Sequence, residues 1–365
     1  MSEAKVVDTS LPVLVTGATG YVAGWVVKRL LEAGCTVHAA VRDPGDAKKI
    51  AHLKATEATT PGSLHFFASN LLRDGSYAEA MRGCATVFHT ASPFVLNPND
   101  PQRDLIDPAK LGTTNVLQHA AKTPTVRRVV LTSSYMAAIG DNADMTRDGK
   151  AAVTEEDWNT TSSPTHQPYA YSKTIAERTA WEIAESQSQW KLVTINPAFV
   201  MGPGVTPNAT SESFQFIKDI TGGKFAGGIP NFGMAFVDVR EVADAHLNAA
   251  FLPAAHGRYL VSAVNASLPH LAELLKQEFG GQGFSLPKRT VPKALAWLIG
   301  PLLDGTLTRK AVARNVNHPL ILDNGKSRRE LGLSYRPLTE TVREMVQQLL
   351  DAGVIVGRSQ SKGVQ

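Results

Sequence analysis

The sequence predicts a doubly wound α/β fold, in which helices cover both faces of a parallel sheet and a smaller, mostly helical region follows. Three observations predict it. Short apolar runs alternate with amphipathic stretches through the first half of the chain. The first apolar run ends in a glycine-rich turn, VTGATGYVAG, directly before a helical stretch. The length of 365 residues, at ~150 residues per domain, leaves room for two domains.

The first half of the chain supplies the predicted strands and the helices between them. Strands are expected at LPVLVT (11–16), CTVHAAVR (35–42), SLHFFA (63–68), ATVFHTA (85–91), VRRVVLTSS (126–134) and WKLVTINPA (190–198). Helices are expected at 20–34, 46–55, 104–122 and 168–186, where apolar residues recur at helical spacing. Apolar strands of this kind indicate a sheet buried on both faces. Right-handed crossovers then place the helices on both of its sides.

The second half of the chain is less regular. Residues 140–165 are polar and turn-rich, and they predict a loop. Residues 199–231 are rich in Gly and Pro and predict loops around an active site, with a short helix at 211–220. A strand and a helix resume at 234–252. RYLVSA (258–263) is expected to be the last strand before helices dominate the remainder.

The composition excludes several classes of protein. The 37 basic and 33 acidic residues leave a net charge of +4 and form no basic run, so we expect no nucleic-acid partner. No apolar stretch approaches ~18 residues, so we expect no membrane-spanning helix and no membrane partner. The chain starts without a signal-peptide core and has two cysteines, Cys35 and Cys84, so we expect a cytoplasmic protein. No cluster of residues has metal-ligand spacing, so we expect no metal.

Gly17 and Gly20 occupy the turn between the first strand and its helix. Glycine lets the backbone approach a phosphate closely, and the helix N-terminus directs free N–H groups toward it. This context predicts a dinucleotide-binding site. Sites for NAD carry an acid about 20 residues further on, but here Val41 stands there and Arg42 follows. An arginine can pair with a 2′-phosphate, and Lys49 could add a second charge, so we expect NADP(H).

A second group of residues, YAYSK, contains Tyr169 and Lys173 at the start of a predicted helix. Their spacing puts both side chains on one face. A strand ending in VLTSS places Ser133 and Ser134 at the carboxyl edge of the sheet, where ligands bind. Carbonyl reduction needs a proton on oxygen, and a nearby Lys⁺ is expected to lower the pKa of Tyr169 from ~10 toward neutral pH. We expect Tyr169 to be the general acid/base, with Ser134 holding the substrate oxygen and Ser133 as the alternative.

The order of the motifs resembles that of the extended short-chain dehydrogenase/reductase family. The motifs are TGATGYVAG, AAVRDP, VFHTASPF, GTTNVL, VLTSS, YAYSK, INPAFVMGPG and FVDVREVADAH. The resemblance spans about residues 11–353 and is strongest to dihydroflavonol-reductase-like proteins, which include plant flavonoid and cinnamoyl-CoA reductases and microbial aldehyde and ketone reductases. It implies a Rossmann-type domain at 10–198, completed by 233–263. The substrate-binding domain would comprise 199–232 and 264–355, followed by a disordered tail at 356–365.

The resemblance also implies which residues hold the cofactor. Asn70 departs from the aspartate that is usual at its position. The implied cofactor residues are Gly17, Gly20, Tyr21 and Val22 at the pyrophosphate, Arg42 and Lys49 at the 2′-phosphate, Asn70 and Leu71 at the adenine, Thr90 and Ala91 at the nicotinamide ribose, Tyr169 and Lys173 at the ribose hydroxyls, and Pro197 and Val200 at the nicotinamide.

The substrate markers of the plant enzymes are absent from the sequence. Flavonoid enzymes carry an Asn five residues after the catalytic Ser, where this chain has Ile139. Cinnamoyl-CoA reductases carry NWYCYGK around the catalytic Tyr, where this chain has HQPYAYSK. Both departures argue against those two activities. Phe94, Tyr135 and Ile139 instead predict a mostly apolar pocket, with His166 near its mouth.

We therefore expect an NADPH-dependent reductase that acts on a small-molecule aldehyde or ketone, or on the corresponding alcohol, as a monomer or a homodimer. One alternative is a nucleotide-sugar epimerase or dehydratase, or a 3β-hydroxysteroid dehydrogenase-like enzyme, built on the same Tyr/Lys pair. Another is a non-catalytic protein that senses NADP(H).

Overall fold

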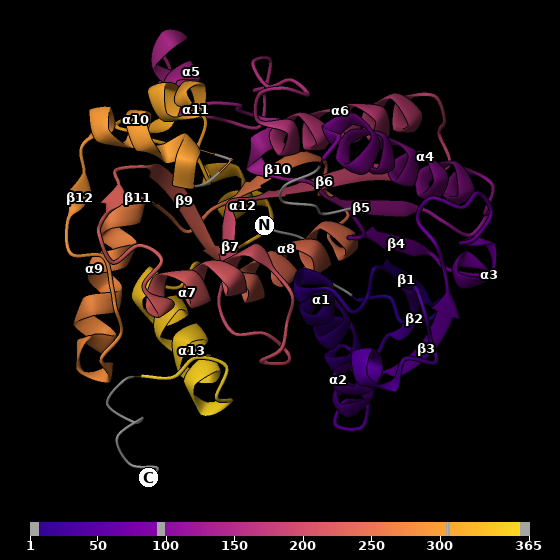
Figure 1. Ribbon diagram of the computed structural model, residues 1–365. Helices are drawn as coiled ribbons and strands as arrows, with labels where there is room; N and C mark the ends of the chain where they lie inside the picture. Colours follow the sequence, from indigo (N-terminus) through magenta and orange to yellow (C-terminus); the bar gives the residue numbers. More distant parts are fainter. Residues whose placement is uncertain (1–6, 93–98, 304, 306, 358–365) are drawn as a thin grey trace.

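A parallel sheet of seven strands forms the centre of the computed structural model (Figure 1). The structure describes residues 7–92, 99–303, 305 and 307–357. In spatial order the strands are β10 (Gly257–Val261), β6 (Lys191–Pro197), β5 (Arg128–Thr132), β4 (Thr86–His89), β1 (Val13–Thr16), β2 (Thr36–Val41) and β3 (Ser63–Ala68). The strand order reverses between β1 and β4. Ligands of doubly wound sheets bind at this reversal, outside the carboxyl ends of the strands.

Helices cover both faces of this sheet. One face packs against α1 (Tyr21–Glu32), α2 (Ala47–Glu57) and α8 (Val239–Phe251). The other face packs against α3 (Ala78–Met81), α4 (Asp107–Ala121) and α6 (Pro168–Glu185), and a short π-helix, η1 (Gln102–Ile106), leads into α4. Central strands such as Val13–Thr16 are buried throughout because both of their faces meet helices.

A second lobe follows the sheet and lies at the left of Figure 1. It contains a three-stranded sheet, β11 (Val264–Ser267), β9 (Gly233–Asp238) and β7 (Phe199–Met201), and a two-stranded one, β12 (Thr290–Val291) and β8 (Ile229–Pro230). Its helices are α7 (Glu212–Gly222), α9 (Leu268–Phe279), η3 (Gly280–Gln282), α10 (Lys293–Leu303), α11 (Arg309–Asn315) and α13 (Leu338–Asp351). Helix α12 (Gly325–Glu330) instead packs beside β10 at the edge of the large sheet. Residues of α7, α9, α13 and β9 share one apolar core.

The predicted fold class is confirmed, and so are the expected strands and helices of the first half. The predicted loop at 140–165 contains a short helix, α5 (Asn142–Arg147), because Asp141 and Asp144 form a capping box there. A short 3-10 turn, η2 (Tyr135–Ala137), precedes it. Strands β11 and β12 follow RYLVSA, which is therefore not the last strand.

The interval 233–263 is shared between the two sheets. Helix α8 and strand β10 complete the large sheet and its covering layer, as expected. Strand β9 instead pairs with β7 and β11 in the second lobe. The division into a cofactor domain and a substrate domain stays a prediction, and residues 358–365 of the expected tail lie outside the described residues. Within the described part of the chain, no helix is long and apolar enough to cross a membrane.

Candidate active site

The glycine turn after β1 lies against the turn after β4, at the reversal of strand order. Gly17 has a φ of +63°, and a Cβ added to it would lie 3.0 Å from the Cα of Ala91. The backbone N–H of Gly20 donates to the Gly17 carbonyl at 2.9 Å and closes the turn. Gly20 gives α1 no side-chain cap, so the N–H groups of its first turn can serve an anion. These features fit the pyrophosphate of a dinucleotide.

Thr16 and Thr90 join the same two turns by hydrogen bonds. The hydroxyl oxygen of Thr16 accepts the backbone N–H groups of Thr90 at 3.2 Å and Ala91 at 3.1 Å. The hydroxyl of Thr90 donates to the Thr16 carbonyl. Thr16 also lies 2.9 Å from Nδ1 of His89, whose pKa burial lowers to about 3. Thr90 and Ala91 thus have fixed positions beside the glycine turn, where the resemblance placed the nicotinamide ribose.

The first residues of α1 reach toward the second lobe with their side chains. The hydroxyl of Tyr21 donates to the Gly202 carbonyl at 2.7 Å, and its ring meets Phe214 edge-on at 5.2 Å between centroids. Val22 packs against the apolar cores of both lobes. Their backbone N–H groups therefore remain the parts that can face the pyrophosphate.

Two basic side chains stand exposed beyond the carboxyl end of β2. Arg42 follows the last residue of that strand directly. Lys49 is 75% exposed and lies 3.2 Å from Asp46, the residue that caps α2. In the turn after β3, the side chain of Asn70 accepts the N–H of Leu72, and Leu71 packs against Gly112. The positions predicted for the 2′-phosphate and the adenine thus follow adjacent strands of the sheet.

Tyr169 and Lys173 lie in the first two turns of α6 and share one face. The Nζ of Lys173 lies 5.7 Å from the centre of the Tyr169 ring and donates to the hydroxyl of Ser92 at 3.1 Å. Lys173 is buried, and burial lowers its pKa to about 8. Ser92 follows β4 and was not predicted from the sequence. Its place two residues after Thr90 in the HTAS segment could have indicated it.

The pKa of Tyr169 differs from the expectation. Burial raises it above the ordinary value, and nearby Tyr135 and Glu212 act in the same direction. The predicted lowering by Lys173 is therefore wrong for this structure, because the loss of solvent around the phenol is the largest influence on its pKa and raises it. At neutral pH Tyr169 holds its proton, as a proton donor must.

The two serines after β5 have different partners. The hydroxyl of Ser133 donates to the buried carboxylate of Glu177. The Oγ of Ser134 accepts the N–H of Met136 at 3.2 Å, as the cap of η2, which leaves its hydrogen able to bind another acceptor. Tyr135, the next residue, is buried with a pKa raised to about 12 and interacts electrostatically with Tyr169. The geometry thus favours Ser134 over Ser133 as the residue that faces a substrate oxygen.

His166 is held by a carboxylate just before the catalytic helix. Its Nε2 lies 2.8 Å from Asp141, which also accepts from Arg314 at 2.6 Å and from Asn315 at 2.7 Å. The following residue, Gln167, has a φ of 55°, the left-handed region that non-glycine residues seldom adopt. His166 therefore joins the start of α6 to α11, and its contact with substrate stays a prediction.

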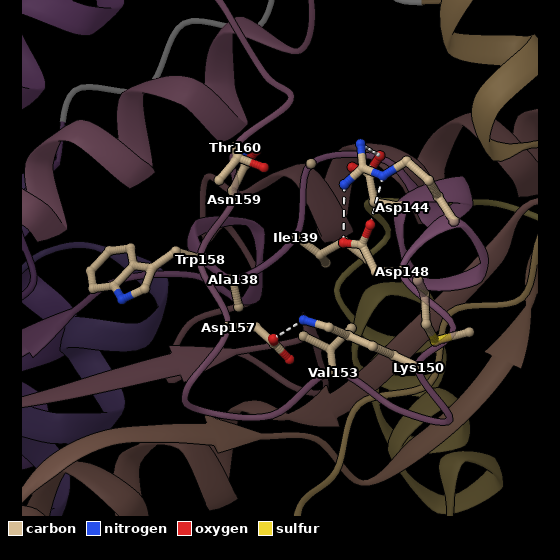
Figure 2. Close-up of a pocket in the computed structure, with 13 residues that line it drawn as sticks. Ala138, Ile139, Asp144, Asp148, Lys150, Val153, Asp157, Trp158, Asn159 and Thr160 are labelled. Atoms are coloured by element: carbon tan, nitrogen blue, oxygen red, sulfur yellow. Dashed lines mark hydrogen bonds and ion pairs between the residues drawn. The ribbon is translucent and has the colours of Figure 1, made fainter.

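Ile139 lies at a small cavity of about 30 Å³ (Figure 2). The lining mixes apolar side chains, such as Val153, with ion pairs, such as that of Lys150 with Asp157. Its volume admits only about one or two water molecules, too few for a carbonyl substrate. The place of Ile139 in a substrate pocket stays a prediction. Phe94, the other apolar residue predicted there, lies outside the described residues.

The chain after β6 contains an aromatic residue that packs against α7. Pro197 ends β6, and half-buried Val200 lies in β7. The ring of Phe199 meets that of Phe216 at 6.1 Å between centroids. Phe216 stands one helical turn beyond Glu212, whose carboxyl acts on Tyr169. Phe216, which lies in the helix expected at 211–220, was not singled out from the sequence.

Three comparisons place this geometry among known proteins. Residues 13–261 match the model of the NAD dependent epimerase/dehydratase family. A cinnamoyl-CoA reductase of Medicago truncatula is 35% identical over 340 residues, which cover 92% of this chain and 95% of that protein. A putative anthocyanidin reductase of Ginkgo biloba is 39% identical over 73% of this chain and 80% of that protein. The chain belongs to the extended short-chain dehydrogenase/reductase family.

Solved structures of this family have the same fold. Gre2 from Candida albicans superposes with a TM-score of 0.76 at 30% identity, over 94% of this chain and 99% of that one. The yeast methylglyoxal/isovaleraldehyde reductase Gre2, solved with NADPH, gives a TM-score of 0.74 at 26% identity, over 94% and 100% of the chains. The predicted resemblance, an enzyme of the oxidoreductase class and a nicotinamide cofactor are thereby confirmed.

The site also contains features for which the comparisons assign nothing. No cluster of three metal-binding side chains occurs among the residues described, and the predicted absence of a metal stays a prediction. Three polar residues near Tyr169 and Lys173 were not predicted: the exposed Ser92 and the buried Glu177 and Asn196. In the sequence, Glu177 and Asn196 were indistinguishable from ordinary helix and strand-end residues.

Proposed function

We propose that this protein is an NADPH-dependent reductase of aldehydes or ketones. The observation that carries the proposal is the joint position of Tyr169, Lys173 and Ser134 at the carboxyl edge of the sheet, beside the turns after β1 and β4. A protein that only senses NADP(H) would not need a buried lysine, hydrogen-bonded to Ser92, beside Tyr169.

The residues present fit NADPH. The Gly17 turn packs too closely against Ala91 for a Cβ, the first turn of α1 carries no side-chain cap on its N–H groups, and Arg42 and Lys49 offer exposed positive charges to a 2′-phosphate. When bound, the nicotinamide supplies the hydride for the carbonyl carbon. Thr90, Ala91 and Lys173 would hold its ribose, and Pro197 and Val200 would contact the nicotinamide ring.

The protein's own residues supply the proton. Tyr169 keeps its proton at neutral pH because burial raises its pKa, so it can donate to the developing oxygen. Lys173, with a pKa of about 8, is still largely charged at pH 7 and stabilises the phenolate that donation leaves behind. Ser134 donates a hydrogen bond to the same oxygen and orients the carbonyl. Together these three groups favour reduction of a carbonyl over abstraction of a proton from an alcohol at neutral pH.

The aromatic residues of β7 and α7 favour an apolar substrate. Phe216 is half-buried, and its ring lies within 6.1 Å of Phe199 and 5.8 Å of Phe225 between centroids. Aromatic side chains that line a pocket bind apolar and aryl groups by burying their apolar surface and by ring packing. We therefore propose aliphatic or aryl aldehydes and ketones as substrates.

NADPH consumption against a panel of aryl aldehydes, α-diketones, β-keto esters and a dihydroflavonol tests this function. Turnover of apolar carbonyls with NADPH, and a higher KM for them in Phe216→Ala, would support the proposal. Tightly bound NAD in the purified protein, together with turnover of a sugar nucleotide or a steroid, would contradict it.

A further inference from the structure

A buried carboxylate lies on the catalytic helix one turn beyond Lys173. Glu177 has no exposed surface and follows Lys173 by four residues, as Lys173 follows Tyr169. Residues at this spacing share a helix face. Taking an ionised carboxylate out of water is costly unless it is paired and hydrogen-bonded. Glu177 can therefore be buried beside Tyr169 and Lys173 only if other groups compensate its charge.

Three side chains from the neighbouring strands lie within hydrogen-bond distance of this carboxylate. Ser133, at the end of β5, donates its hydroxyl to Oε2. Asn196, near the end of β6, donates its amide to the same oxygen at 2.6 Å and a second hydrogen to the Ser134 carbonyl at 3.1 Å. The hydroxyl of Thr194, also on β6, has one hydrogen for two acceptors, Oε1 of Glu177 at 3.2 Å and Oδ1 of Asn196 at 3.0 Å. One carboxylate thus connects α6 to the strand ends, and through Asn196 to the backbone of Ser134.

An arginine of β10 also donates to this carboxylate, as does the indole Nε1 of Trp181 at 3.4 Å. The Nε of Arg258 donates to Oε1 of Glu177 at 2.6 Å, and its Nη1 donates to the Glu155 and Asp157 carbonyls. The guanidinium lies 4.0 Å from the centre of the Trp158 ring. Arg258 is therefore fixed on three sides and holds Glu177 from the edge of the sheet.

We propose that Glu177 is a positioning residue for the reduction. Its carboxylate holds α6 against β5 and β6 so that Tyr169 and Lys173 face Ser134, and its negative charge keeps the ammonium group of Lys173 in place. This inference rests on the proposed function.

The charged groups around Lys173 are few. Tyr169 on α6, Tyr135 on η2 and His89 on β4 are all neutral at pH 7, because burial raises the pKa of each phenol and lowers that of the imidazole. Arg258 adds a positive charge beyond Glu177. The negative charge of Glu177 raises the pKa of Lys173 against the effect of burial.

Glu177→Gln removes the charge with little change in size. The matched control is Glu182→Gln, an exposed glutamate of the same helix. The amide nitrogen of the glutamine would face the groups that donate hydrogen bonds to Glu177, and it cannot accept from them. The variant Glu177→Gln therefore risks failing to fold. The double variant Glu177→Gln/Arg258→Met removes both charges and so avoids an unpaired arginine. Two readouts are followed: the pH profile of kcat/KM with NADPH, and an NMR titration of labelled Lys173, assigned with Lys173→Met.

For folded Glu177→Gln, we expect kcat to fall at least ~10-fold, because small misplacements of catalytic groups are costly. We also expect the Lys173 titration to shift down by about one pH unit. In the double variant the shift should be smaller, because the positive charge of Arg258 is removed too, while kcat stays low. Values in either folded variant that match Glu182→Gln in both kcat and titration would overturn the proposal.

The two proposals fail in different ways. If the wild-type protein reduces no carbonyl on the panel, the proposed function fails, but the Lys173 titration still decides whether Glu177 acts on it. If the wild type is active and the titration and kcat are insensitive to Glu177, the reductase stands and the positioning role falls.

Discussion

Lys173 donates a hydrogen bond from its ammonium group to the hydroxyl of Ser92, across 3.1 Å. This bond joins the catalytic helix α6 to the segment after β4, at the reversal of strand order. Lys173 is thus held by Ser92, and Glu177 on the same helix raises its pKa against the effect of burial. The position of its charge is a property of the folded sheet and not of α6 alone.

The titration of Lys173 predicts a pH limit for catalysis. Burial lowers its pKa to about 8, so its charge is lost as the pH rises through that value. If the charge stabilises the phenolate of Tyr169, kcat/KM should decline above about pH 8. A pH–rate profile measures this decline, and Lys173→Met should lack it at a much lower overall rate. A wild-type rate that stays level up to pH 10 would speak against the role of the charge.

The two serines after β5 should respond differently to removal of their hydroxyls. Ser134→Ala removes the donor for the substrate oxygen and the cap of η2, so it should lower kcat by about 100-fold and cost about 1 kcal/mol of unfolding free energy. Ser133→Ala takes a donor from the buried carboxylate of Glu177 and should cost about 1–3 kcal/mol of unfolding free energy. Kinetics and urea unfolding of both variants give the comparison. The reverse pattern would assign the catalytic role to Ser133.

Arg42 should determine the preference for NADPH. Loss of a charged hydrogen bond of about 1.5–3 kcal/mol predicts that Arg42→Ala raises the KM for NADPH roughly 10- to 100-fold and leaves that for NADH unchanged. Arg82→Ala, an exposed arginine that precedes β4 and so stands near the opposite edge of the sheet, is the control. Equal increases in the KM for NADPH and for NADH would show that Arg42 does not bind the 2′-phosphate.

His246 should make the protein sensitive to acid. It is buried between Thr132 and the Val242 carbonyl, and burial lowers its pKa from 6.5 to about 4. Between these values the unfolded chain binds the proton and the folded protein does not, so stability is present above pH 6.5 and is lost as the pH falls toward 4. At ~1.4 kcal/mol per pKa unit the loss is on the order of 3 kcal/mol.

Urea unfolding of His246→Gln at several pH values checks this origin of acid sensitivity. The variant should show a shallower dependence between pH 4 and 6.5 than the wild type, with exposed His256→Gln as the control. Parallel curves for wild type and His246→Gln would assign the acid sensitivity to other groups, such as His89.

The alternation of strands and helices could be predicted because each strand of the large sheet is a short apolar run and each helix has apolar residues at helical spacing. The glycine turn and the YAYSK pair could be predicted because the residues of each lie close together in the sequence. β7 and β9 were not assigned to a second sheet, since strands of 3 and 6 residues carry too little pattern to reveal their partners.

The remaining features of the site depend on contacts between distant segments. Ser92 and Lys173 are 81 residues apart, and Ser133 and Glu177 are 44 apart, so neither pair follows from spacing. The pKa of Tyr169 was expected to fall because its lysine is visible in the sequence, whereas the burial that raises it is not. Local motifs thus identify the reacting groups, whereas the contacts and the burial that shift their pKa values depend on the fold.

Tyr169→Phe tests the central claim most directly, with NADPH binding and carbonyl reduction measured on the same sample. The phenyl ring keeps the buried packing and removes the proton. We predict that the variant binds NADPH as the wild type does and that kcat falls by at least ~100-fold, the range of general acid catalysis. Reduction at the wild-type rate by a variant that binds NADPH normally would contradict the assignment of Tyr169 as the proton donor.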